Sequence, residues 1–149
     1  MKSLISLFVL TLSSASFAQG LQNFNGDYKL NFSISACNPN ARVEVSGTKI
    51  KIINQDLRDN RGWSTVTLTP GLKSSAPVPG ITQTSKVSVA GTVVSVETTT
   101  RRGGSESSYV KDTYTFSEKN GRKSLMISLA VSTRGNVSGY GTSCGYEKQ

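Results

Sequence analysis

Apolar and polar residues alternate with a period of two along most of the chain. The segment DYKLNFSI shows the pattern, with four residues on one face of an extended strand: Tyr28, Leu30, Phe32 and Ile34. Period-two alternation is typical of a half-buried β-strand, whereas the apolar residues of an amphipathic helix recur every three or four positions. No apolar cluster repeats at helical spacing, so the sequence predicts an all-β protein.

Further segments with strand character follow at short intervals, and turn-forming residues separate them. The strand candidates are residues 42–53 as a hairpin around Ser46-Gly47, 63–69, 84–90, 92–100, 108–117, 124–133 and 138–146. Glycine, asparagine and proline are frequent between them, as in tight turns, at 37–40, 90–91, 101–106, 118–122 and 134–136. This spacing predicts sequential antiparallel pairing of about eight or nine strands.

The first 18 residues differ from the rest of the chain. A basic start at Lys2, an apolar run from Leu4 to Leu12 and small residues ending at Ala18 form the pattern of a secretory signal peptide. The run is shorter than the roughly 20 apolar residues of a transmembrane helix. We expect residues 1–18 to be removed, residues 19–149 to form one domain, and the protein to be secreted or periplasmic.

The chain has two cysteines, Cys37 and Cys144, and the second stands close to the C-terminus. In an oxidising compartment two cysteines most simply pair, which would tie the first structured segment of the mature chain to the last. A redox-active or metal-binding pair is the alternative, but the sequence has neither C-x-x-C spacing nor any histidine. We therefore predict a structural Cys37–Cys144 disulfide.

A meander whose first and last strands are joined by a disulfide is most simply a closed or nearly closed up-and-down barrel, because closure removes exposed sheet edges. A two-sheet β-sandwich is the alternative. The longest connector, residues 69–81, contains three of the four prolines, and we expect either a lid over the barrel mouth or an inert surface loop.

A membrane-spanning β-barrel would show the same alternation of apolar and polar residues. Several candidate strands are shorter than the about 9 to 11 residues that a membrane-spanning strand needs, so we expect no membrane span.

The segment NGDYKLNF opens the first strand with Gly26, one intervening residue and the aromatic Tyr28. In this respect it resembles lipocalins and their avidin-like relatives, whose first strand begins with the motif G-x-W. Tyr28 stands in place of the tryptophan. The resemblance implies a secreted β-barrel of the calycin type whose interior binds a small apolar or amphipathic molecule.

The chain has few side chains suited to catalysis. Without histidine it cannot assemble Ser-His-Asp or Cys-His chemistry, and the commonest zinc ligand is missing. Asp56 and Asp59 are the closest approach to a carboxylate cluster, but Arg58 and Arg61 interleave with them, which is typical of a solvated turn. We expect no enzymatic activity, no cofactor and no bound metal.

The chain is basic, with 17 lysine and arginine residues against 9 acidic residues and a formal net charge of +8. The basic residues are dispersed, and no basic aromatic motif of the RNA-binding kind is present, so we expect no nucleic-acid partner. An anionic envelope component, such as lipopolysaccharide or a phospholipid head group, suits an exported basic protein better. The alternative is that the charge only keeps the protein soluble.

Two functional hypotheses follow, and both treat the protein as a monomer. In the first, the barrel interior binds a small apolar or amphipathic ligand, and basic residues at its mouth favour an acidic head group. The inward residues predicted to line this site are Tyr28, Leu30, Phe32, Trp63, Tyr114 and Phe116. In the second, the protein is a non-enzymatic interaction or inhibitor protein that contacts another macromolecule through Arg101, Arg102 and the 69–81 connector.

Overall fold

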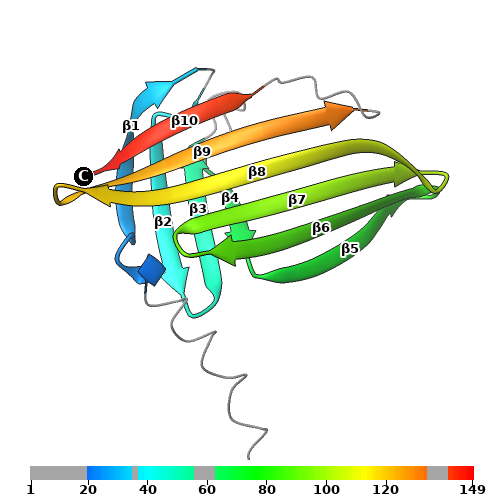
Figure 1. The fold of residues 1–149 in the computed structure, drawn as a ribbon, viewed down its shortest axis with the longest axis horizontal. Helices are drawn as coiled ribbons and strands as arrows, with labels where there is room; N and C mark the ends of the chain where they lie inside the picture. Colours follow the sequence, from blue (N-terminus) through cyan, green and yellow to red (C-terminus); the bar gives the residue numbers. More distant parts are fainter. Residues whose placement is uncertain (1–19, 35–36, 56–62, 134–140) are drawn as a thin grey trace, which may run out of the picture.

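The computed structural model describes residues 20–34, 37–55, 63–133 and 141–149. The predicted signal peptide, the Asp56 and Asp59 pair and the predicted turn at 134–136 lie outside these ranges; the backbone of Trp63 is described but its side chain is not. Within the described chain, ten strands form one antiparallel sheet (Figure 1). Their bounds are β1 (Gly26–Ser33), β2 (Asn40–Ser46), β3 (Lys49–Gln55), β4 (Trp63–Leu68), β5 (Gly71–Val78), β6 (Ile81–Ala90), β7 (Val93–Arg102), β8 (Ser105–Lys119), β9 (Arg122–Thr133) and β10 (Thr142–Lys148).

The strands form a meander, as the sequence predicts. Their order across the sheet is β4-β3-β2-β1-β10-β9-β8-β7-β6-β5, so all neighbours are consecutive in the sequence except β1 and β10. These two strands pair antiparallel, from Tyr28 opposite Lys148 to Ser33 opposite Cys144. The first and last strands therefore occupy the centre of the sheet, where β1 and β10 lie side by side (Figure 1).

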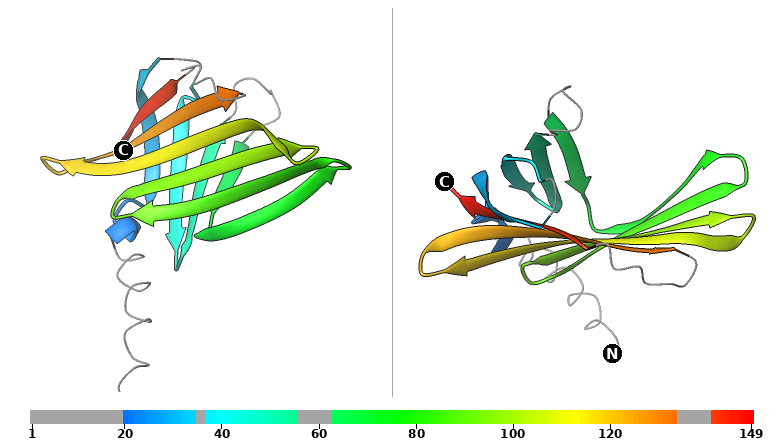
Figure 2. Two further views of the ribbon diagram at one scale, coloured as in Figure 1. Left: turned by 45° about the vertical axis from the view of Figure 1, so that its right-hand side comes forward. Right: turned by 90° about the horizontal axis from the view of Figure 1, so that it is seen from above.

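The sheet is curled, but it is not closed into a barrel. Its two edges are β4 and β5, which are joined by Thr69 and Pro70 but do not pair with each other. Proline has no backbone N–H to donate, and Gly71 has a φ of +132°, which residues with a side chain rarely adopt. The two strands diverge from this connection (Figure 2), so the predicted barrel stays open between β4 and β5.

The proline-rich connector at 69–81 contains a strand, so the prediction of a loop or lid is wrong. Residues 71–78 form β5, which pairs with β6 and is exposed along its whole length. The pairing register shifts between Ser75 and Val78, on either side of Pro77, and proline is tolerated because an edge strand forms ladder hydrogen bonds on one side only. Since β5 buries neither face, it lacks the apolar alternation that identifies the other strands.

The core lies on the concave side of the curled sheet. The Tyr28 hydroxyl donates a hydrogen bond of 2.7 Å to the Phe24 carbonyl oxygen, and the ring centroids of Phe24 and Phe116 lie 5.4 Å apart. The segment before β1 thus covers part of the core. The buried residues come from this segment and from both halves of the sheet: Leu21, Phe24, Tyr28, Ala41, Val43, Val45, Ile50, Ile52, Leu68, Val94, Tyr114, Phe116, Leu125 and Tyr146.

A β-bulge in β1 reverses the face of Phe32. The register of β1 against β10 shifts between Leu30 and Phe32, so that Asn31 is an extra residue in the ladder. Tyr28 and Leu30 pack with the core, whereas Phe32 lies on the convex face and is 50% exposed. The prediction that Phe32 shares a face with Tyr28 and Leu30 is therefore wrong, because one inserted residue inverts a period-two alternation.

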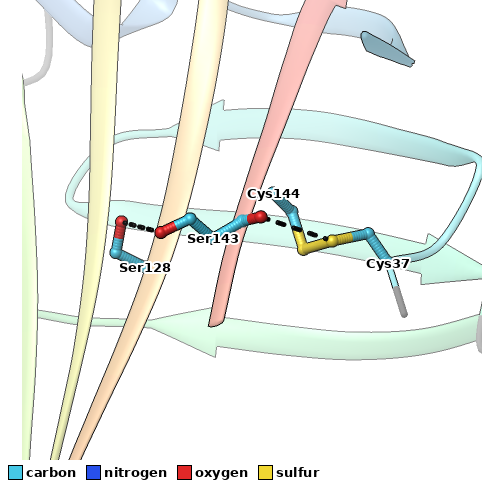
Figure 3. Close-up of a disulfide and its surroundings, with 4 residues drawn as sticks. All are labelled: Cys37, Ser128, Ser143 and Cys144. Carbon is cyan, nitrogen blue, oxygen red and sulfur yellow. Dashed lines mark hydrogen bonds between the residues drawn. A yellow bond between two sulfur atoms is a disulfide. The ribbon is translucent and has the colours of Figure 1, made fainter. Parts of the chain in front are cut away.

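Cys37 and Cys144 form the predicted disulfide, with their Cα atoms 5.8 Å apart (Figure 3). Cys37 lies in the loop between β1 and β2, and Cys144 lies in the central strand β10. The Cys37 Sγ atom is 3.7 Å from the carbonyl oxygen of Ser143, whose hydroxyl oxygen is 3.4 Å from that of Ser128 in β9 (Figure 3). The bond therefore fastens the loop to the middle of the sheet.

We expect two core tyrosines to make the fold sensitive to alkali. Burial raises the pKa of Tyr28 and of Tyr114 to about 12. Because the folded state holds both hydroxyls protonated, their contribution to stability is complete below the unfolded pKa of about 10 and is lost as the pH rises through the folded pKa. We expect the free energy of unfolding to fall over this interval. Denaturant unfolding at a series of pH values, followed together with tyrosinate absorbance, measures the effect.

The variant Tyr28→Phe is the control for this prediction. It removes one titrating hydroxyl, so the alkaline decrease in stability should become smaller. At neutral pH it should cost about 1–3 kcal/mol, because the Phe24 carbonyl loses its buried donor. A free energy of unfolding that stays constant until the pH passes about 12 would contradict the prediction.

Candidate functional site

Of the residues predicted to line a ligand cavity, the five whose side chains are described do not form one open site; the side chain of Trp63 lies outside the described part of the structure. Tyr28, Tyr114 and Phe116 have exposed fractions of 1%, 6% and 1%, so their side chains are packed against other core residues. Leu30 is partly buried at the margin of the core, and Phe32 lies on the opposite face of the sheet. At these positions the concave side is filled by protein.

The outer ends of β5–β9 extend beyond the core as a projection that we call the wing (Figures 1 and 2). The wing comprises residues 71–85, 98–110 and 130–133, and those whose side chains are described, which excludes only Thr133, are half-buried or exposed. It therefore adds accessible surface and little core. Its charged residues are three cations and one carboxylate: Lys73, Arg101, Arg102 and Glu106.

Two hairpin turns lie side by side at the end of the wing. Pro79 and Gly80 connect β5 to β6, and Gly103 and Gly104 connect β7 to β8. The Gly103 N–H donates a hydrogen bond of 3.1 Å to the Gly80 carbonyl oxygen. All three glycines have a positive φ, which allows the tight turns. We call residues 78–82 and 101–106 the wing tip.

The wing tip brings together the residues that the interaction hypothesis names. Arg101 is opposite Thr82 and Arg102 is opposite Ile81, so both arginines lie beside the end of the 69–81 connector. This pairing confirms no function, but it joins two segments that are separate in the sequence: Arg102 shares a face of the sheet with Ile81, and Arg101 lies on the other face with Thr82. Val78, which is opposite Ile81, is 49% exposed there.

The two arginines differ in their surroundings. Arg101 is directly opposite Glu106 on β8, so a carboxylate lies on the neighbouring strand, although no ion pair joins the two residues. Arg102 is opposite Ser105 on one side and Ile81 on the other, and no ion pair reaches it from the residues that the structure describes. Directly opposite residues share a face of the sheet, so Arg102 and Val78 place an exposed cation near an exposed apolar side chain.

A second accessible surface lies on the concave face, between the core and the wing. One row of directly opposite residues crosses β6, β7, β8, β9 and β10, with one half-buried residue on each strand. We call this row the concave strip. Its members are Val87, Val96, Asp112, Leu129 and Thr142. The concave strip thus combines accessible apolar side chains with one carboxyl group.

Asp112 is the residue that sequence reasoning missed. Burial raises the pKa of its carboxyl group above the usual value of 3.8, and within the described chain no hydrogen bond or ion pair reaches it. The sequence does carry a signal, because Val110, Asp112, Tyr114 and Phe116 alternate on one face of β8. Asp112 is the one charged residue among these four positions.

The bulge in β1 also leaves a shallow hollow of about 170 Å³ on the convex face. Phe32 and Met126 line it, and Gly145 lies between them. A Cβ atom at Gly145 would lie 3.3 Å from Met126 Cε and 3.4 Å from Phe32 Cβ, so the hollow depends on the missing side chain. Glu147 at its border lies 3.6 Å from the Arg122 guanidinium.

No family model matches this chain, and no curated protein sequence matches it. In the part of the chain that the structure describes, no helix is long and apolar enough to cross a membrane. Among the same residues, no three potential metal-ligating side chains gather.

Proposed function

We propose that this protein is a non-enzymatic binding protein that presents its wing tip to an anionic macromolecular surface. The observation that carries the proposal is the hydrogen bond between the two turns, which holds Arg102 near Val78 on one face of the wing tip, with Arg101 on the other face. The net charge of +8 supports an anionic partner. With the predicted export, a phosphate-bearing envelope component fits best.

The chemistry of the wing tip suits such a partner. An arginine guanidinium is always charged and can donate two parallel hydrogen bonds to one phosphate group. Both arginines are exposed, so they are accessible from solution and their long-range attraction is weakened by added salt. Val78 would leave water on contact, which adds a hydrophobic contribution of roughly 25 cal/mol per Å² buried.

The wing itself favours a surface role. Ordering a residue costs about 1–2 kcal/mol of backbone conformational entropy, and burial of apolar area normally offsets that cost. No residue of the described wing is fully buried, so its extension adds little to the core. Because the wing contributes little to the buried core, binding of a partner at the wing tip is a reason for its extension.

Charge reversal at Arg102 tests the proposal. We expect Arg102→Glu to weaken binding to phosphatidylglycerol vesicles at least about tenfold, a loss of at least about 1.4 kcal/mol. Arg101→Glu should have the smaller effect, because Arg101 lies on the face opposite to Val78 and beside the acidic residue Glu106. Co-sedimentation with phosphatidylglycerol and with neutral phosphatidylcholine vesicles, at two salt concentrations, measures both variants.

The matched control is Lys49→Glu, which makes the same change in net charge at an exposed residue at the start of β3, away from the wing. It should leave most of the vesicle binding intact. Equal losses in Arg102→Glu and Lys49→Glu would mean that net charge, and not the wing tip, governs association, and the proposed site would be wrong.

Binding of a small amphipathic ligand is the second candidate function, and the concave strip is the specific observation that favours it. Val87, Val96 and Leu129 are half-buried and offer apolar surface beside the packed core. In this form the hypothesis places the ligand against the open concave face, outside the cluster of Tyr28 and Phe116.

A further inference from the structure

Asp112 occupies an apolar environment on the concave face. Directly opposite it are Val96 on β7 and Leu129 on β9. Its neighbours on the same face of β8, two residues away in each direction, are Val110 and Tyr114. Side chains at these positions are the closest neighbours in an antiparallel sheet. The carboxyl group therefore lies among three aliphatic side chains and one aromatic ring.

Among the residues that the structure describes, no basic side chain on the neighbouring strands compensates the carboxylate. Lys111 and Lys86 face the convex side, where Lys111 lies 3.3 Å from Glu97. Lys73 shares the concave face but lies on β5, three strands away, at about 14 Å across the sheet. Tyr114 has a pKa of about 12 and is neutral at physiological pH.

An uncompensated carboxylate of this kind is costly unless another group supplies the missing hydrogen bonds. Removing a polar group from water without a partner costs several kcal/mol for a fully buried group and less for one that is half-buried, as Asp112 is. Asp112 is accessible to a ligand for the same reason. The surrounding valine and leucine side chains would contact the apolar part of that ligand.

We propose that Asp112 and the concave strip bind an amphipathic ligand with an ammonium head group, whose nitrogen donates hydrogen bonds to the Asp112 carboxylate. This inference rests on the second proposed function and names the head-group chemistry of its ligand. An ammonium group is a compact charge with up to three donors, so it supplies what Asp112 lacks. The apolar chain lies toward Val96 and Val87, which cover about 10 Å of the face from β8 to β6.

Three probes of equal chain length separate the head group from the apolar chain: octylammonium, octanol and octanoate. We expect isothermal titration of the full mature chain at neutral pH to show octylammonium binding about tenfold more tightly than octanol, and octanoate binding most weakly. In Asp112→Asn the preference for the ammonium over the alcohol should disappear, while the affinity for octanol stays unchanged. Glu97→Gln, on the convex face of β7, is the matched control and should retain the preference.

Stability measurements on Asp112→Asn keep the binding result interpretable. Burial raises the folded pKa of Asp112, so its ionised form destabilises the fold above that pKa and the penalty vanishes below the unfolded value. Asp112→Asn should therefore be at least as stable as the parent protein at neutral pH, with the difference disappearing in acid. A folded variant that binds differently reports on the ligand and not on unfolding.

Each outcome separates the inference from the function on which it rests. Equal affinity for octylammonium and octanol, or an ammonium preference that survives in Asp112→Asn, would overturn the inference and leave small-ligand binding standing. If none of the three probes binds, the inference and the second proposed function fail together. The wing-tip proposal is independent of both.

Discussion

Reduction of the Cys37–Cys144 disulfide is expected to lower the free energy of unfolding by about 2–5 kcal/mol. The cysteines are 107 residues apart, so the bond closes most of the described chain into one loop. In the chain-entropy model a loop of about this size restricts the unfolded state by about 4.7 kcal/mol. Urea denaturation of the protein with and without reductant measures the difference.

The double variant Cys37→Ser/Cys144→Ser is the control for reduction. It should show the same loss of stability as the reduced protein, and added reductant should not change it further. If the oxidised and reduced proteins unfold at the same urea concentration, the bond between the β1–β2 loop and β10 does not stabilise the fold.

Truncation of Phe116 is the second large effect, and we expect Phe116→Ala to cost about 3–5 kcal/mol. Phe116 is 1% exposed, it contacts the Phe24 ring, and it lies opposite Leu125 in the core. Removing the ring leaves a cavity on the concave side that the paired strands cannot close. Equilibrium unfolding in denaturant measures the loss.

Thr115→Ala is the matched control, because Thr115 is the preceding residue of β8 and faces the convex side. Its cost should stay below about 1 kcal/mol, within the range of strand propensity. Comparison of Phe116→Ala with Thr115→Ala also separates two roles for Phe116. If Phe116 only lined a ligand site, its truncation would change binding and leave stability almost unchanged. Equal losses of stability in both variants would contradict a core role for Phe116.

Much of the fold could be predicted from local patterns. The alternation in β2 and β3 and the Asn120-Gly121 turn between β8 and β9 appear in the sequence and in the structure. These features depend on the pleat of a single strand and on the conformations that turn residues tolerate. The pairing of Cys37 with Cys144 followed from having only two cysteines in a chain predicted to be exported.

The wrong predictions concern segments whose conformation depends on the strands that pair with them. Phe32 has the same alternation as Tyr28, but the bulge opposite β10 moves it to the convex face. Strand β5 has no apolar alternation because it lies exposed at an edge. Neither a bulge in a ladder nor the position of a strand in a sheet is a property of one segment.

The sequence by itself determined an all-β meander, its principal turns and one disulfide, because each depends on residues that are close in the chain or that have a single possible partner. Only the tertiary structure decided that the sheet stays open between β4 and β5, that Arg102 lies beside Ile81 in the wing tip, and that Asp112 lies between Val96 and Leu129 in the concave strip. These features depend on register and curvature over the whole sheet. Register is set jointly by hydrogen bonds and burial on several strands, so no single segment of the sequence contains it.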